Sequence, residues 1–388
     1  MKNSPRLCLK MRNRAFCRAL APVLLLTTMS VSSHVNAQEL SLPCDEVEEK
    51  VKAATAADEV KRITAFQPAK AIERQAPDYP IEAARRGQEG WVKMSYVIDE
   101  EGHVQDPVIS DYSGSRAFKR KALSAIKRWT FEPAMKDGKP TQQCHQAVQM
   151  DFMMGGRRGA SGRFISAYKD VDSIYQQGNY VEADAALQRL HEKDNLNRYE
   201  NAWLWNMDAN IASGLEDWQR ELDSFARMLP SNKGDEKKYD VFGDDHIAFV
   251  HQRMVILASQ FGLYADALSY YDRLNEMEGQ QQRIDEIAPL VTKIRDHINS
   301  DDAIKVTVTI DKRGNWFHTL VRNQFAFDNI QGDLDTVEVR CDTHREKFTV
   351  AEDHVWKIPE SWGQCRVLVE GDKSTAFNLI EVAQTTSS

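Results

Sequence analysis

The clearest hydrophobic pattern along the chain is an alternation between residues 91 and 98. Val92, Met94, Tyr96 and Ile98 occupy every second position of this stretch. Period two is the repeat of a β-strand, in which successive side chains point to opposite faces of a sheet. The pattern therefore predicts a strand with one apolar face, and the predicted elements on either side complete one folding unit.

That unit covers residues 74–154 and is predicted to be a compact α+β fold with an antiparallel sheet. The Asp99–Gly102 turn joins the first strand to a second one as a hairpin. The predicted order is a short helix at 81–86, strands at 91–98 and 103–110, a helix from Ser115 through Trp129, and a last strand at 144–153. The last strand follows a long loop, so we expect it at a sheet edge.

A glycine- and arginine-rich linker at 155–163 separates this unit from a helical stretch at 164–300. Two predicted helix pairs there share the spacing G-x-Y-x-x-A, beginning at Gly178 and at Gly262, and a third pair turns near Gly214. These hairpins resemble tetratricopeptide repeats, which implies a groove that binds a second protein partner.

The hydrophobic period changes back to two after residue 300, with Ile304, Val306, Val308 and Ile310 on one face of a strand. Further strands are predicted at 316–326, 335–341, 346–350, 364–370 and 376–382. Many short strands separated by turns favour a small β-sandwich at 301–388. The whole chain is thus predicted to be an α+β multidomain protein.

The N-terminus has the composition of an export signal. A basic stretch precedes the apolar run Ala19–Val31, and Val35-Asn-Ala37 fits a cleavage site. We predict a signal peptide at 1–37 and an exported protein, with a retained membrane anchor over 19–35 as the alternative. Residues 38–73, rich in Glu, Lys and Ala, are predicted to form a helical lead-in.

Composition narrows the classes of function. The chain has 388 residues and a formal net charge of −8, without the basic stripe of a nucleic-acid-binding protein. No phosphate-binding loop, catalytic triad, paired-carboxylate signature or metal-ligand spacing is present in the sequence. We therefore expect a protein that is not an enzyme, with no cofactor, no metal and no nucleic-acid partner.

Four cysteines follow the predicted signal: Cys44, Cys144, Cys341 and Cys365. An even number in an exported chain suggests disulfides. Sequence order favours the pairs Cys44–Cys144 and Cys341–Cys365, and unpaired buried thiols are the alternative.

Residues 75–153 resemble the C-terminal domain of TonB-family energy transducers. The residues that carry the resemblance are Tyr79, Pro80, Ala83, Ala84, Gly87, Gly90, Trp91, Val92, Asp99, Gly102, His103, Val104, Ser113, Gly114, Ala122, Ala125, Trp129, Phe131, Pro133, Gly138, Pro140, Val148, Met150 and Phe152. Their order and spacing over about a fifth of the chain make the resemblance specific.

The resemblance implies a domain that meets TonB-dependent outer-membrane receptors and takes up the receptor's TonB box as an added strand. It would serve energy-coupled uptake of the iron-siderophore or cobalamin type. The implied receptor-binding residues are Gln75, Asp78, Tyr79 and Pro80 before the first helix, and Gln146, Ala147, Val148, Gln149, Met150, Asp151 and Phe152 on the last strand. If the N-terminal segment is retained, the ExbB–ExbD motor is an implied partner.

Two departures from the family pattern keep a second hypothesis open. Full transducers carry an uncleaved anchor and a proline-rich spacer, whereas this chain has a signal-like N-terminus and no such spacer. The alternative is a soluble periplasmic scaffold or peptide-binding adaptor without energy transduction.

Overall fold

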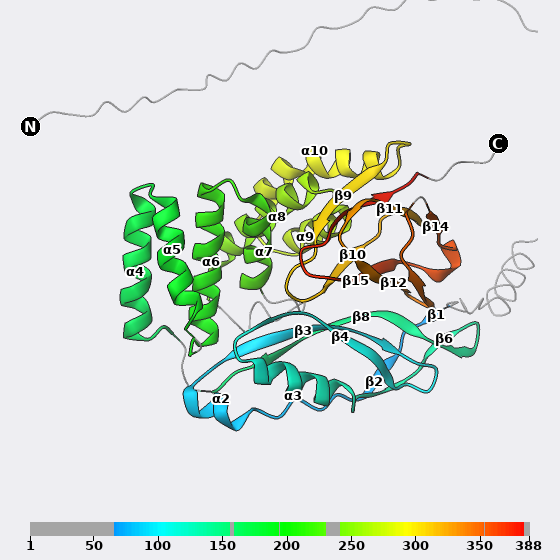
Figure 1. The fold of residues 1–388 in the computed structure, drawn as a ribbon, viewed down its shortest axis with the longest axis horizontal. Helices are drawn as coiled ribbons and strands as arrows, with labels where there is room; N and C mark the ends of the chain where they lie inside the picture. The colour runs from blue at the N-terminus through cyan, green and yellow to red at the C-terminus, as the bar shows by residue number, and fades with distance from the viewer. Residues whose placement is uncertain (1–65, 156–158, 194, 230–240, 353, 384–388) are drawn as a thin grey trace, which may run out of the picture. The chain divides into compact units, whose positions relative to one another are not determined.

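The computed structural model describes residues 66–383, apart from 156–158, 194, 230–240 and 353 (Figure 1). The predicted signal peptide, the alternative anchor and Cys44 lie outside the described residues. The end of the predicted helical lead-in is corrected, because Phe66–Gln67 (β1) and Lys70–Glu73 (β2) are strands. Both belong to the unit that follows, since β1 pairs with Ala134–Lys136 (β6) and β2 with Thr130–Glu132 (β5).

A three-stranded antiparallel sheet is the centre of this unit. Its strands are Gly90–Ile98 (β3), Val104–Ser113 (β4) and Gln143–Phe152 (β8), in the order β4-β3-β8. The second strand was predicted over 103–110, and the observed β4 extends further, to Ser113. In the register of β3 and β8, Val92 lies opposite Met150. The last strand lies at the edge of the sheet, as predicted.

Two helices flank the sheet. Ile81–Arg86 (α2) follows Pro80 and ends at Gly87, whose φ of 67° is favourable for glycine. Arg116–Ile126 (α3) lies against the sheet and is capped by the Ser115 side chain (Figure 1). The predicted helix is thus too long at its C-terminus. Trp129 lies beyond it, and its indole N–H donates to the backbone of Gln75 at 2.8 Å.

The apolar face of the sheet packs against α3 in one hydrophobic cluster. It joins alternate residues of β3 and β8 to the inner face of the helix, and its strand and helix members include Val92, Met94, Tyr96, Ile98, Val148, Met150, Phe152, Phe118, Ala122 and Ile126. Phe118 and Phe152 stack with their ring centroids 4.4 Å apart. The apolar face predicted from the period-two pattern is therefore the face that packs against α3 in the core.

Seven helices follow among the residues that the structure describes. Their bounds are Gly162–Gln176 (α4), Tyr180–His191 (α5), Arg198–Gly214 (α6), Trp218–Met228 (α7), Asp244–Gln260 (α8), Tyr264–Asn275 (α9) and Gln281–Ile298 (α10). Consecutive helices pack side by side, with turns at Gly178, Gly214 and Gly262 as predicted. At Gly214 a Cβ atom would lie 2.7 Å from the Tyr180 ring. The absence of a side chain there lets α5 and α6 approach closely.

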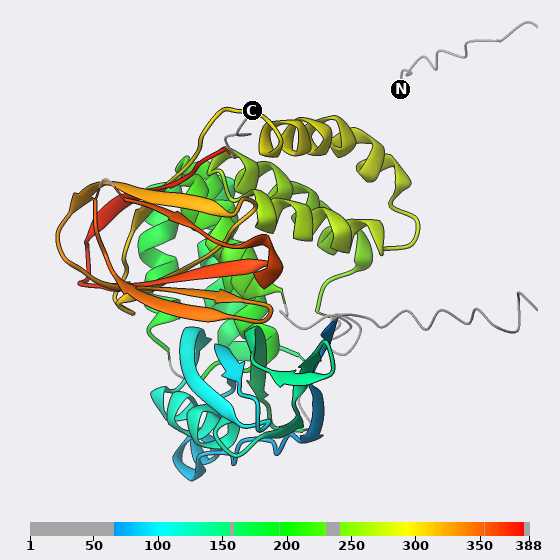
Figure 2. The same cartoon turned by 90° about the vertical axis from the view of Figure 1, so that its right-hand side faces the viewer.

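The C-terminal part contains two four-stranded antiparallel sheets (Figure 2). Their strands are Ile304–Thr309 (β9), Asn315–Thr319 (β10), Gln324–Gln331 (β11), Leu334–Cys341 (β12), Arg345–Thr349 (β13), Val355–Lys357 (β14), Cys365–Gly371 (β15) and Ala376–Glu381 (β16). The orders are β10-β15-β12-β13 and β14-β11-β16-β9. Members of both sheets share one hydrophobic cluster. The single strand predicted at 316–326 is in fact two strands, β10 and β11, which belong to different sheets.

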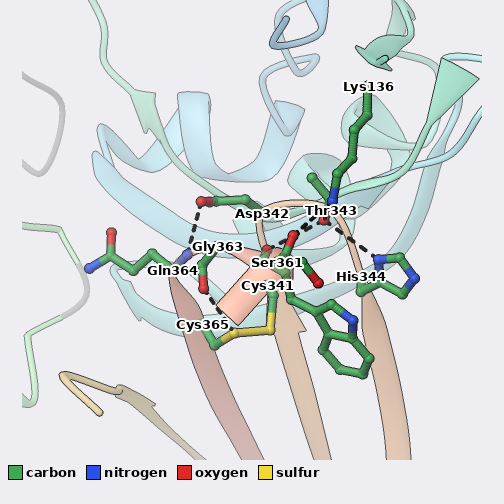
Figure 3. The surroundings of a disulfide bond; sticks show 10 residues. Lys136, Cys341, Asp342, Thr343, His344, Ser361, Gly363, Gln364 and Cys365 are labelled. Atoms are coloured by element: carbon green, nitrogen blue, oxygen red, sulfur yellow. Dashed lines mark hydrogen bonds between the residues drawn. A yellow bond between two sulfur atoms is a disulfide. The ribbon is translucent and has the colours of Figure 1, made fainter. Parts of the chain in front are cut away.

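A disulfide joins Cys341 at the end of β12 to Cys365 at the start of β15 (Figure 3). These residues lie directly opposite each other in the register of the two strands. The bond closes a sequence separation of 24 residues. It confirms the second of the two predicted cysteine pairs.

Removing this disulfide should destabilise the C-terminal sheets. The chain-entropy account gives a loss of about 3 kcal/mol for a loop of this length. We expect Cys341→Ser/Cys365→Ser to unfold at lower denaturant than the wild type, and a reductant should lower the wild-type midpoint without changing that of the double variant. Equal unfolding free energies for the two oxidised proteins would contradict a stabilising bond.

Candidate functional site: the edge of the three-stranded sheet

The open side of the sheet is the outer edge of β8. Among the described residues, β8 pairs with β3 and with no other strand. An edge strand carries backbone N–H and C=O groups that an extended peptide can match. The residues on β8 differ in exposure: Ala147 is exposed, His145 and Gln146 are half-buried, and Val148 to Met150 are buried. The accessible part of the strand is therefore its first half.

The side chains in the second half of β8 are directed into the protein. Val148, Met150 and Phe152 belong to the core beneath α3. Gln149 is 4% exposed, and its amide donates to Asp151 at 2.9 Å. Asp151 in turn lies 3.9 Å from the guanidinium of Arg198 at the start of α6. These five predicted contact residues thus have structural partners, which leaves Gln146 and Ala147 as the predicted residues accessible on this strand.

The predicted contact residues before α2 lie against the α3 side of the unit. Gln75 accepts a hydrogen bond from Arg128, and Asp78 forms an exposed ion pair with Lys121 at 3.4 Å. The Tyr79 hydroxyl donates to the backbone carbonyl of Gln88. Burial, with the nearby Glu89 carboxylate, raises the pKa of Tyr79 to about 12. Pro80 is buried at the start of α2, so Gln75 and Asp78 are the exposed members of this group.

The second face of the sheet is also buried. Trp91, Ser95 and Val97, which alternate with the α3-facing residues of β3, are each 1% exposed. The ammonium group of Lys93 donates to the carbonyl of Ala226 near the end of α7 at 2.8 Å. Burial lowers the pKa of Lys93 to about 8, and this effect outweighs the attraction of Asp111.

Polar side chains of the C-terminal sheets also contact this second face of the sheet. Arg340 on β12 is 2% exposed and binds both carboxylate oxygens of Glu338, at 2.9 and 3.0 Å. Its remaining donors reach the Ser95 hydroxyl at 3.4 Å and the Asp106 carbonyl at 3.3 Å. Lys136 extends to the Ser361 carbonyl at 2.7 Å (Figure 3). Buried charges require such pairing, because an unpaired charge is costly in the interior.

The opposite edge of the sheet, on β4, is capped by side chains from the C-terminal part. Arg313 donates to the Ser110 carbonyl at 2.7 Å and forms an ion pair with Asp111 at 3.0 Å. Asn315 donates to the Ile109 carbonyl at 3.4 Å. The two edges of the sheet therefore differ. Side chains of the C-terminal part donate to carbonyl groups along β4. Along β8 the Gln146 amide donates to the adjacent His145 carbonyl at 3.0 Å, and no second strand of the described residues pairs with β8.

This second buried face was not predicted from the sequence. A signal was present, because Trp91 and Val97 place large apolar side chains on the face that Lys93 and Ser95 also occupy. Glu89 was also missed. It is 6% exposed, and its two carboxylate oxygens accept from the backbone N–H groups of Met154 and Arg198, each at 2.7 Å. This carboxylate thereby links the end of the sheet to the N-terminus of α6, where negative charge is favourable.

Cys144 on β8 is buried and forms no disulfide with another described cysteine. Burial raises its pKa to about 12, so the reactive thiolate is disfavoured. Its predicted pairing with Cys44 stays a prediction, because Cys44 lies outside the described residues.

Within residues 66–383, gaps excepted, no cluster of side chains suited to a metal ion is found. The described helices also include none long and apolar enough to cross a membrane.

Comparison with known proteins identifies the class of domain to which this sheet belongs. Residues 75–154 match the family described as Gram-negative bacterial TonB protein C-terminal. This part of the chain is therefore a TonB C-terminal domain, as the resemblance predicted.

The relatives are TonB proteins themselves. The TonB protein of Pseudomonas aeruginosa is 35% identical over 83 residues, which cover 21% of this chain and 24% of that protein. The TonB protein of Vibrio cholerae is 36% identical over 74 residues, covering 19% of this chain and 30% of that protein. The chain thus spans less than a third of the length of these relatives.

Among solved structures, the solution structure of the Pseudomonas aeruginosa TonB C-terminal domain is 30% identical to this chain. The match covers 24% of this chain and 92% of that structure, with a TM-score of 0.22. The helices and sheets that cover the second face lie outside the residues that match the family.

The lowered pKa of Lys93 predicts a pH dependence of stability. In the unfolded chain a lysine titrates near pH 10.4, so the unfolded state binds more protons than the folded state between about pH 8 and 10. Stability from this residue therefore rises with pH across that window. We expect the unfolding free energy of the wild type to rise relative to that of Lys93→Met between pH 8 and 10, measured by urea denaturation.

The exposed Lys127→Met variant controls for the loss of one positive charge, and its curve should run parallel to that of the wild type. A constant difference in unfolding free energy between the wild type and Lys93→Met over this pH range would contradict the prediction, because Lys93 would then have the same pKa in the folded and unfolded states.

Proposed function

We propose that this chain binds TonB-dependent outer-membrane receptors by adding a receptor peptide as a fourth strand along the open edge of β8. The observation that carries the proposal is the difference between the two sheet edges in a TonB C-terminal domain: β4 is capped by Arg313 and Asn315, and β8 is open. Main-chain hydrogen bonds supply affinity in this mode with little demand on the peptide sequence.

The accessible stretch of β8 defines where the peptide would bind. His145, Gln146 and Ala147 are the partly or fully exposed residues at its centre. Asp151 and Gln149 have partners within the protein, so the proposed side-chain contact on β8 comes from Gln146. Gln75 and Asp78, which are exposed before α2, form a separate proposed contact with the receptor. The proposed role is energy-coupled uptake of the iron-siderophore or cobalamin type in the periplasm.

The other modules extend the proposal. We interpret α4–α9 as divergent tetratricopeptide-like pairs that bind a second protein partner, and the two C-terminal sheets as a β-sandwich. In the structure both modules contribute groups that cover the second face of the sheet, through Ala226 and Arg340. This cover holds β3 and β8 in place, so that the open edge is preorganised for an added strand.

Proline substitutions at Gln146 and Ala147 test strand addition. Along an edge strand, successive N–H groups alternate between the neighbouring strand and the open side, so one of the two substitutions removes an outward donor while the ladder with β3 stays intact. We expect that variant to keep its unfolding free energy and to bind a labelled TonB-box peptide at least about tenfold more weakly. Fluorescence anisotropy would measure the affinity.

Side-chain controls separate main-chain from side-chain recognition. Gln146→Ala and Ala147→Val keep every backbone donor, and each should bind within about twofold of the wild type if main-chain bonds dominate. A scrambled peptide controls for composition. Unchanged binding by both folded proline variants would rule out strand addition at β8.

The two hypotheses, an energy transducer and a soluble periplasmic scaffold, differ in whether the N-terminal segment is retained. Mass spectrometry of the mature protein isolated from the envelope would decide between them. A retained N-terminal segment fits a transducer that meets ExbB–ExbD. A chain that starts at Gln38 would lack the predicted anchor segment. The protein would then be a soluble adaptor that binds peptides at the same edge.

A further inference from the structure

A second surface lies on the other side of the sheet from β8, where α3 and β4 meet the turn between β9 and β10. A groove there has a volume of about 510 Å³. It is lined by Pro107, Ile109, Tyr112, Arg116, Lys119, Leu123, Lys312, Arg313 and Asn315, and we call it the basic groove. Its lining includes four cationic side chains and no carboxylate, in a chain whose formal net charge is −8.

The cations of the basic groove are not equivalent. Arg313 is neutralised by Asp111 at 3.0 Å and by Asp311 at 2.8 Å. The Lys119 ammonium lies 4.2 Å from the centroid of the Tyr112 ring. Arg116 and Lys312 are both exposed, and neither forms an ion pair with another described residue. Two positive charges are therefore available to a partner.

The groove is also lined by apolar side chains, which we call its apolar floor. Pro107, Ile109 and Leu123 contribute hydrocarbon, and the Tyr112 ring supplies an aromatic surface. Arg116 is the first residue of α3, so the positive end of the helix dipole adds to its charge. A site with cations around an apolar floor is complementary to a ligand that carries negative charge next to a hydrophobic group.

The groove is assembled from two parts of the chain. Arg116 and Lys119 come from the TonB C-terminal domain, whereas Lys312 and Arg313 come from the β9–β10 turn, which lies outside the residues that match TonB proteins. The position of that turn is held by the bonds from Arg313 and Asn315 to carbonyl groups of β4. Two of the four cationic side chains of the groove therefore come from a part of the chain outside the matched domain.

We propose that the basic groove binds an acidic peptide segment of a partner protein, with a hydrophobic side chain of that segment on the apolar floor. Carboxylates of the segment pair with Arg116 and Lys312, which lie on opposite modules. A recess with an apolar floor fits a protruding peptide better than it fits a flat membrane surface. The site is independent of β8, because β4 and β8 are opposite edges of the sheet.

The test is the affinity of the full chain for a labelled peptide with acidic residues flanking a leucine, measured by fluorescence anisotropy. Arg116→Glu and Lys312→Glu should each weaken binding at least about tenfold, since each replaces attraction by repulsion. Arg120→Glu makes the same charge change on an exposed part of α3 outside the groove, and it should stay within about twofold. Replacing the leucine of the peptide by serine should also weaken binding.

Two results would overturn the proposal. One is an equal effect of Arg120→Glu and Arg116→Glu, which would show attraction to the overall charge of α3 rather than to the groove. The other is binding to vesicles with anionic phospholipid that depends on Arg116 and Lys312 while the acidic peptide does not bind, which would assign the groove to a lipid surface. Unchanged binding in Ala147→Pro would confirm independence from β8.

Discussion

The architecture depends on the burial of both faces of one three-stranded sheet. One face packs on α3 through apolar residues. The other is covered through polar contacts: Lys93 to Ala226, Ser95 to Arg340, and Glu89 to the start of α6. Buried polar groups are tolerated when each has a partner, and such contacts also fix orientation more narrowly than apolar packing does.

This constraint connects the fold to the proposed functions. The modules that cover the second face also place Arg313 and Asn315 on the carbonyl groups of β4, and so block one edge against strand pairing. The same arrangement brings Lys312 beside Arg116 and forms the basic groove. The TonB C-terminal domain thereby keeps one edge of its sheet unpaired, which is the proposed site for a receptor peptide, and has on its other side a charged surface built jointly with the additional module.

Much of the fold could be predicted from local patterns, because alternation and turn residues act over a few positions. Val92 to Ile98 defined the core strand, and Gly178, Gly214 and Gly262 marked the helix turns. The site was harder, because exposure depends on distant packing. Gln149 and Asp151 look like solvent-facing polar residues in the alternation, yet α6 covers them, some 50 residues away in the sequence. The strands β1 and β2 were mistaken for helix because their partners β6 and β5 lie more than 55 residues later.

Residue-resolved amide hydrogen exchange of the intact chain, with and without a TonB-box peptide, tests the central claim most directly. If a peptide adds to the open edge, alternate amides between Gln143 and Ala147 on β8 should exchange quickly in the free protein and become protected on binding, while exchange along β4 should not change. Protection that appears along β4, or at neither edge despite bound peptide, would contradict the account.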